Sequence, residues 1–180
     1  MKKFILLINI VFCLSSIAYC MAGPAPTQLS SEEIAYKDKI IAMPCKVEEE
    51  GVWGLEMVTA SLSFKADKNS IAMVRARSQE YLSQYSNMKL EATTDYLIST
   101  YMPKTTSAFD YGYKVIIKPD GNNFTVDVKC SSAKGSAFVS GPKPKPDMHA
   151  KMLANYLRTG EIYPKFIYYG ENYKAMSIWE

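Results

Sequence analysis

The sequence lacks the residues and motifs on which most common enzyme chemistries depend. It has one histidine, His149, and no G-x-S-x-G, C-x-x-C, G-x-x-x-x-G-K-[ST] or G-x-G-x-x-G motif. A Ser-His-Asp or Cys-His nucleophile would have to use His149, zinc chemistry would need further ligands, and nucleotide phosphates would have no glycine-rich cradle. We therefore predict no cofactor and no metal, and interpret His149 as a surface or boundary residue near a helix start.

Long hydrophobic runs are also scarce. Residues 4–18 form one of about 15 residues that follows Lys2 and Lys3, whereas a membrane-spanning helix needs roughly 20. This layout is typical of a secretory signal peptide. We predict that residues 1–22 are removed, with no transmembrane span left, and that the protein is exported, periplasmic or secreted, and bacterial. An alternative is that Cys20 carries a lipid anchor, as in bacterial lipoproteins.

The charge balance gives no sign of a nucleic-acid partner. The chain has 21 basic and 18 acidic residues, and removing residues 1–22 takes away two lysines and no acid, which leaves 19 against 18. A nearly neutral chain has no overall field that attracts a polyanion such as DNA or RNA. We predict no nucleic-acid binding.

The cysteines suggest the same oxidising compartment. Cys13 and Cys20 belong to the signal segment, so the mature chain keeps Cys45 and Cys130. Two cysteines in an exported protein favour one disulfide. The bridge would close a loop of about 85 residues, which the loop-entropy model values at roughly 4 kcal/mol. The alternative is a pair of free thiols.

Local patterns predict an α+β fold: a small antiparallel sheet with a central hairpin at about 111–130, a long helix at about 70–102 and a shorter C-terminal helix at about 147–159. Ser30 and Glu33 match a capping box that begins a short helix before Pro44. Strict alternation over residues 55–64 predicts a half-buried strand. The sequence PDGN at 119–122 supplies the hairpin turn.

The remaining segments complete the expected domain plan. We expect a disordered mature N-terminus at 23–29, then one α+β domain over 30–180 with a proline-rich linker at 141–146. The acidic run at 48–50 is interpreted as a solvated loop. Residues 135–140 are expected to add a third short strand, and the aromatic tail after Gly160 to form short strands. Asp147 and Gly160 are expected to begin and end the last helix.

Tyrosine is abundant, with 13 in the chain. Tyr163, Tyr168, Tyr169 and Tyr173 form the densest cluster, and tyrosine offers large contact area at low entropic cost. We name these four as a candidate binding surface, with core and strand packing as the alternative. Arg75, with Arg77 nearby, is interpreted as part of a solvated helix face.

Two functions follow from these observations. The first is an exported, non-catalytic cell-envelope or secreted protein that binds a protein or wall component, such as a secretion or conjugation accessory, an inhibitor or an immunity factor. The second is a small secreted hydrolase that cleaves glycans with paired carboxylates. The acidic residues expected within regular elements are Glu56, Glu80, Glu91, Asp95 and Asp127.

Overall fold

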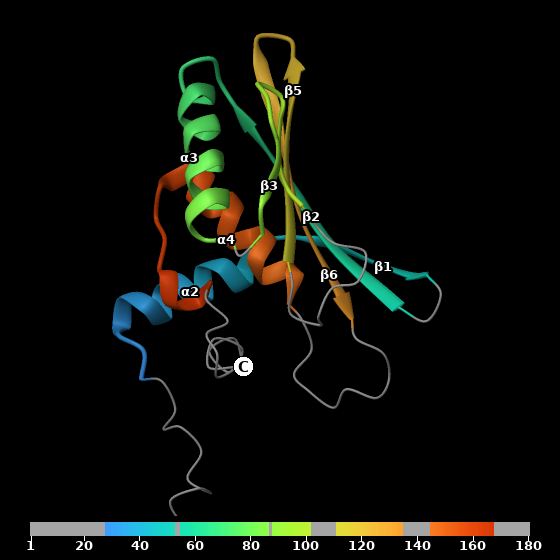
Figure 1. Cartoon of the computed structure of the whole chain (residues 1–180). Coiled ribbons are helices and arrows are strands. Elements are labelled where there is room, and N and C mark those ends of the chain that lie inside the picture. Colours follow the sequence, from blue (N-terminus) through green and yellow to red (C-terminus); the bar gives the residue numbers. More distant parts are fainter. Residues whose placement is uncertain (1–27, 53–54, 87, 102–110, 135–144, 168–180) are drawn as a thin grey trace, which may run out of the picture.

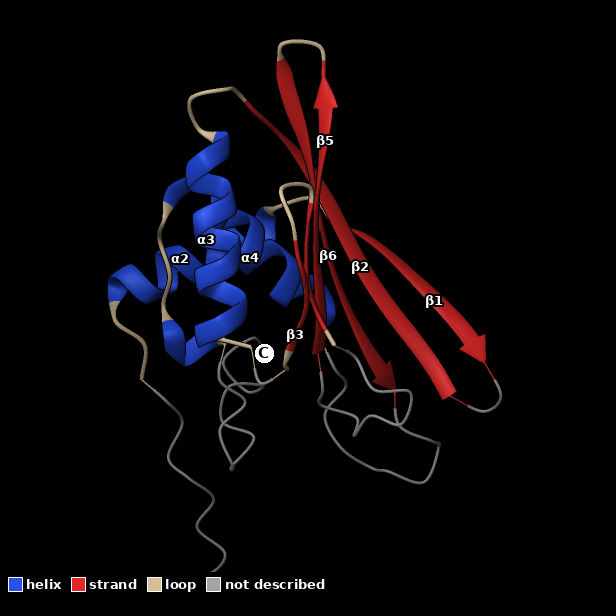
Figure 2. Cartoon of the chain, turned by 45° about the horizontal axis from the view of Figure 1, so that its top comes forward, coloured by secondary structure: helices blue, strands red, loops and turns tan. Residues whose placement is uncertain are grey.

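Six strands and three α-helices make up the described part of the chain, residues 28–52, 55–86, 88–101, 111–134 and 145–167 of a computed structural model. The strands form one antiparallel sheet in the order β1-β2-β6-β5-β4-β3, and the helices lie together on one face of it (Figure 1, Figure 2). The elements are α2 (Ser31–Ala42), β1 (Lys46–Val52), β2 (Leu55–Ala66), α3 (Ile71–Gln84), β3 (Leu90–Thr93), β4 (Leu97–Thr100), β5 (Tyr111–Asp120), β6 (Asn123–Lys134), α4 (Pro146–Thr159) and a 3-10 helix (Pro164–Phe166). The α+β class is confirmed, with a larger sheet than the sequence predicted.

The alternating patterns produce β2 and the β5–β6 hairpin as expected. On β2, Val58 and Ala60 are buried under the helices while Ser63 is exposed. The β5–β6 hairpin pairs Asp120 with Asn123 across a two-residue turn. Gly121 in that turn has φ 59°, a left-handed conformation that glycine adopts without steric cost.

The predicted capping box begins α2. The Ser30 hydroxyl accepts a hydrogen bond from the backbone N–H of Glu33, and the Glu33 carboxylate accepts one from the backbone N–H of Ser30. Two of the amide groups at the helix start that lack intrahelical partners are satisfied in this way. The helix then packs through Tyr36 and Ile40, which are fully enclosed.

The long helix predicted for 70–102 was too long. α3 ends at Gln84, and residues 90–100 form the short strands β3 and β4. Thr94 makes the turn between them, because its hydroxyl accepts hydrogen bonds from the backbone N–H groups of Tyr96 and Leu97. Short apolar runs such as these fit a strand or a helix equally well by periodicity alone.

The acidic run is a strand rather than the predicted loop. Residues 48–50 lie in β1, which pairs along its length with β2 and forms one edge of the sheet. All three glutamates are exposed. A charged edge strand is a common way to prevent a sheet from pairing with another chain.

α4 lies in the middle of the molecule. It packs on the strands β2 and β6, and the helices α2 and α3 contact its other sides (Figure 1). Ten of its 14 residues are buried. Lys145 occupies the N-cap position, so Asp147 lies in the first turn and is not the predicted cap. Gly160 ends the helix at φ 77°, as predicted.

Some predictions concern residues outside the described ranges. These are the signal segment, most of the mature N-terminus, the third strand at 135–140, most of the proline-rich linker and the tail after Ile167. The described start of the tail contains the 3-10 helix and no strand. None of the described helices combines the length and apolar character needed to cross a membrane.

Candidate functional site

Cys45 and Cys130 are free thiols, so the predicted disulfide is not formed. The Cys45 Sγ lies 3.4 Å from the carbonyl oxygen of Ser61, just before β1 begins, while Cys130 is fully buried on β6 opposite Ala60. β2 separates the two, and two strand spacings amount to about 10 Å. Disulfides need Cα atoms within about 7 Å. Burial raises the pKa of both thiols.

Only Tyr163 of the predicted tyrosine surface lies in the described part of the chain, and it is half-buried. Its ring centroid is 4.8 Å from that of Tyr36 on α2 and 6.4 Å from that of Phe166. These contacts attach the tail segment to the first helix. Tyr163 therefore packs against the core, and the other three tyrosines, at 168, 169 and 173, lie outside the described residues.

The sequence predicts a surface or boundary position for His149, but the structure shows it buried. Its side chain on α4 is 1 % exposed and stacks on Tyr111 at a centroid distance of 4.1 Å, and its Nδ1 lies 2.6 Å from the hydroxyl of Tyr113. Burial lowers the pKa of His149 to about 3, so the ring is neutral at physiological pH. Enclosed in this way, the imidazole joins α4 to β5.

The carboxylates named for a hydrolase lie on separate elements. Glu56 lies in β2, Glu80 in α3, Glu91 in β3, Asp95 in the β3–β4 turn and Asp127 in β6. Glu80 accepts a hydrogen bond of 2.8 Å from the Tyr156 hydroxyl, and Asp127 accepts one of 2.7 Å from Ser63. Within the described ranges, no three His, Cys, Asp or Glu side chains gather as a metal site would require.

The sheet face opposite the helices carries polar side chains, and we call it the open face. No described helix covers it (Figure 2). Its residues come from alternate positions of five strands: Lys46 and Glu48 on β1, Thr59, Ser61, Ser63 and Lys65 on β2, Thr125, Asp127, Lys129 and Ser131 on β6, Lys114, Ile116 and Lys118 on β5, and Leu97 and Ser99 on β4. Hydroxyl groups and charges make up most of this face, and Ile116 and Leu97 form a neighbouring apolar pair on it.

Three of the lysines on the open face have acidic partners. Lys46 pairs with Glu48, Lys65 with Asp120 and Lys118 with Asp127. The remaining two, Lys114 and Lys129, lie directly opposite each other on the neighbouring strands β5 and β6. We call them the lysine pair, and neither forms an ion pair with another residue in the described ranges.

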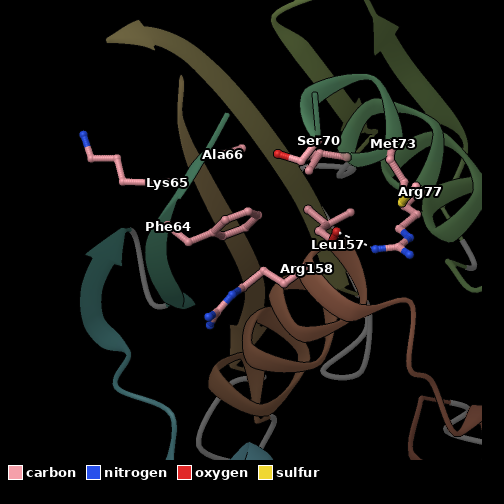
Figure 3. Close-up of a pocket in the computed structure, with 9 residues that line it drawn as sticks. Phe64, Lys65, Ala66, Ser70, Met73, Arg77, Leu157 and Arg158 are labelled. Atoms are coloured by element: carbon pink, nitrogen blue, oxygen red, sulfur yellow. Dashed lines mark hydrogen bonds between the residues drawn. The ribbon is translucent and has the colours of Figure 1, made fainter. Parts of the chain in front are cut away.

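A groove lies at the other side of the molecule, where the end of β2, the start of α3 and the end of α4 meet (Figure 3). Its volume is about 190 Å³. It is lined by Phe64, Lys65, Ala66, Ser70, Met73, Val74, Arg77, Leu157 and Arg158. None of these lining residues is acidic, so the groove has a positive rim around an apolar floor.

The two arginines of the groove are held differently. Arg77 donates a hydrogen bond of 3.1 Å to the carbonyl oxygen of Leu157 and lies against Gly160, so it closes the C-terminal end of α4. Arg158 is exposed, and its guanidinium carbon lies 6.0 Å from the centroid of the Phe64 ring. Figure 3 places Phe64 and Arg158 on one side of Leu157 and Arg77 on the other.

Sequence reasoning did not find this groove. Arg77 was assigned to a solvated helix face, although it contacts a residue 80 positions further along the chain. Arg75 makes contacts elsewhere: it donates a hydrogen bond to the carbonyl oxygen of Asp95, and its guanidinium lies over the Tyr96 ring. No local pattern links Phe64 to Arg158, because only the packing of α4 on β2 brings them together.

Comparisons with known proteins identify no relative. No family model matches the chain, and neither does any curated protein. Among solved structures, a conserved protein of unknown function from Enterococcus faecalis is similar at 10% sequence identity, over 75% of this chain and 88% of that one. The TM-score of that match is 0.34. A likeness of this degree carries no argument about fold or function.

Proposed function

We propose that the protein is an exported, non-catalytic component of the cell envelope that binds a protein or wall component through the open face. The signal-like segment at residues 1–22 supports export. The polar open face supports binding, since the twisted six-stranded sheet presents a broad surface that no described helix covers (Figure 2). The single histidine and the lack of a G-x-S-x-G or C-x-x-C motif give no support to serine, cysteine or zinc hydrolysis.

The lysine pair is the observation on which this proposal depends. Side chains directly opposite on antiparallel strands have Cβ atoms about 5 Å apart, and like charges there destabilise the sheet. Lys114 and Lys129 occupy such positions, and their row continues through Ser61 and Ser99 on the neighbouring strands. An anionic partner lying across the row would remove the repulsion and could accept a hydrogen bond from the Ser61 hydroxyl, whereas Ser99 is buried. We therefore propose that the bound component is anionic.

The glycan-cleaving alternative gains no support from the described residues. It needs two carboxyl groups roughly 5–10 Å apart across a cleft. Glu80 is engaged with Tyr156 beside α4, whereas Asp127 lies on the open face with Ser63 and Lys118. We do not pursue this alternative.

A binding experiment with two fractions tests the proposal. The purified protein is mixed with protein-free cell wall that carries its anionic polymers and, separately, with solubilised envelope proteins. We expect retention on one of them, with binding that weakens as salt is raised. The double variant Lys114→Glu, Lys129→Glu should bind at least tenfold less, because it reverses the charge of the row.

The double variant Lys37→Glu, Lys68→Glu is the matched control, since it changes the net charge equally at two positions outside the open face. It should bind as the wild type does. Equal loss in both variants would mean that only overall charge matters. Release of soluble sugar from the wall, or recovery of the native protein from the cytosol with residues 1–22 attached, would contradict the proposal.

A further inference from the structure

We propose that the groove between β2, α3 and α4 binds a carboxylate carried on an apolar group about the size of one amino-acid side chain. The inference concerns a different surface from the open face and does not depend on it. It combines three features of the groove: an arginine that makes no ion pair with any described residue, an apolar floor, and a volume that fits a single small group.

Arg158 supplies the recognition of the anion. In the described part of the chain its contact is the ring of Phe64, at 6.0 Å, and it makes no ion pair there. A guanidinium presents a planar fork of N–H donors that matches a carboxylate with two parallel hydrogen bonds. A carboxylate placed at the rim would therefore find an arginine that is already oriented by its aromatic neighbour.

The floor supplies the apolar part of the site. Phe64, Val74 and Leu157 line the groove, with Met73 at its margin. Figure 3 shows the Phe64 ring and the Leu157 side chain on either side of the hollow, while the Lys65 side chain points away from it. At about 190 Å³ the groove is slightly larger than the 150 Å³ cavity that accommodates benzene in an engineered protein, and smaller than sites for drug-sized molecules.

A carboxylate fits this site better than a phosphate. The backbone amide groups of Asn69 and Ser70, just before α3, are already used, because Asp67 Oδ1 accepts hydrogen bonds from their N–H groups at 3.0 Å and 2.7 Å. A side-chain interaction with Ser70, together with these backbone hydrogen bonds, lowers the pKa of Asp67, so its carboxylate stays charged. The negative charge of Asp67 opposes any anion, and it opposes a doubly charged phosphate more strongly than a singly charged carboxylate.

The same chemistry has two sources, a free aryl or branched-chain acid and the C-terminal residue of a peptide. An NMR titration of the purified protein separates them. The probes are 3-phenylpropionate, its uncharged amide, inorganic phosphate, and the peptide N-acetyl-Ala-Phe with a free or an amidated C-terminus. We expect the backbone signals of Phe64, Ser70 and Arg158 to shift with at least one carboxylate probe, and the matching amide to bind at least tenfold more weakly.

Three variants make the test specific. Arg158→Gln should weaken carboxylate binding at least tenfold, and Arg158→Lys should give an intermediate loss because lysine keeps the charge without the fork. Arg75→Gln removes an arginine of α3 outside the groove and should bind as the wild type does. The proposal is wrong if carboxylate and amide probes bind equally, if phosphate binds more tightly than the carboxylates, or if Arg158→Gln and Arg75→Gln behave alike in folded protein.

Discussion

A single residue, His149, illustrates what the sequence could and could not indicate. The predicted hairpin at about 111–130 contains Tyr111 and Tyr113, and both are buried on β5. Nothing local indicated that both would meet the histidine, because Tyr113 and His149 are 36 positions apart. A histidine near a helix start is usually solvated, whereas here most of the helix is enclosed between the sheet and two other helices.

We predict that the free energy of unfolding falls as the pH is lowered from 7 to 5. Burial lowers the pKa of His149 to about 3 in the folded protein, whereas an unfolded histidine has a pKa near 6.5. Between these values the unfolded chain binds a proton that the folded chain does not, so the stability present above pH 6.5 is lost progressively toward pH 3. By pH 5 the loss should be about 2 kcal/mol.

Urea unfolding at pH 7, 6 and 5 measures this effect. His149 is the only histidine, so no other imidazole titrates in this range, and carboxyl groups contribute little because they titrate mostly below pH 5. The variant His149→Gln should show a flatter dependence over the same interval, whatever its absolute stability. An NMR titration of the native wild type in which the imidazole gains its proton above pH 5 would contradict the prediction.

At the scale of single elements, predictability followed the strength of the local signal. The capping box at Ser30, the PDGN turn and the alternation of β2 each depend on residues that are close in sequence, and all three were confirmed. The prediction of a loop at residues 48–50 was wrong because glutamates by themselves disfavour a strand. These residues adopt the strand β1 only because their backbone pairs with that of β2. The predicted helix was wrong over residues 85–100 because a four-residue strand has too few positions to distinguish a period of two from a helical spacing.

Gly160 gives an element-scale prediction. It has φ 77°, and a Cβ there would approach the Arg77 Nη2 to 2.7 Å. The variant Gly160→Ala should therefore lose about 1–2 kcal/mol of stability, from left-handed backbone strain and from displacement of the guanidinium that bonds the end of α4. Gly51→Ala is the control, because its Cβ would meet nothing within 4 Å. Thermal unfolding of both variants checks this, and equal melting temperatures would contradict it.

At the scale of the whole molecule, the two-layer arrangement was predictable but its wiring was not. The hairpin turn at 121–122 fixes the register of β5 against β6, so the lysine pair follows from a local signal once the turn is placed. The pairing of β2 with β6 does not, since it joins Ser63 to Asp127, 64 positions away. The groove depends on that pairing and on α4, which explains why neither its arginines nor its aromatic residue could be grouped beforehand.

The exposed edge formed by β1 leads to a prediction about association. Residues 48–50 leave one row of backbone groups on the outer side of the sheet, and their charges repel a second edge of the same kind. Replacing Glu48 and Glu50 by threonine removes this repulsion and raises strand propensity. We expect the variant to dimerise or aggregate as its concentration is raised, as measured by analytical ultracentrifugation.

The variant Glu32→Gln, Asp38→Asn removes the same charge from α2 and should sediment as the wild type does. Should both variants associate alike, the cause would be net charge and not the edge.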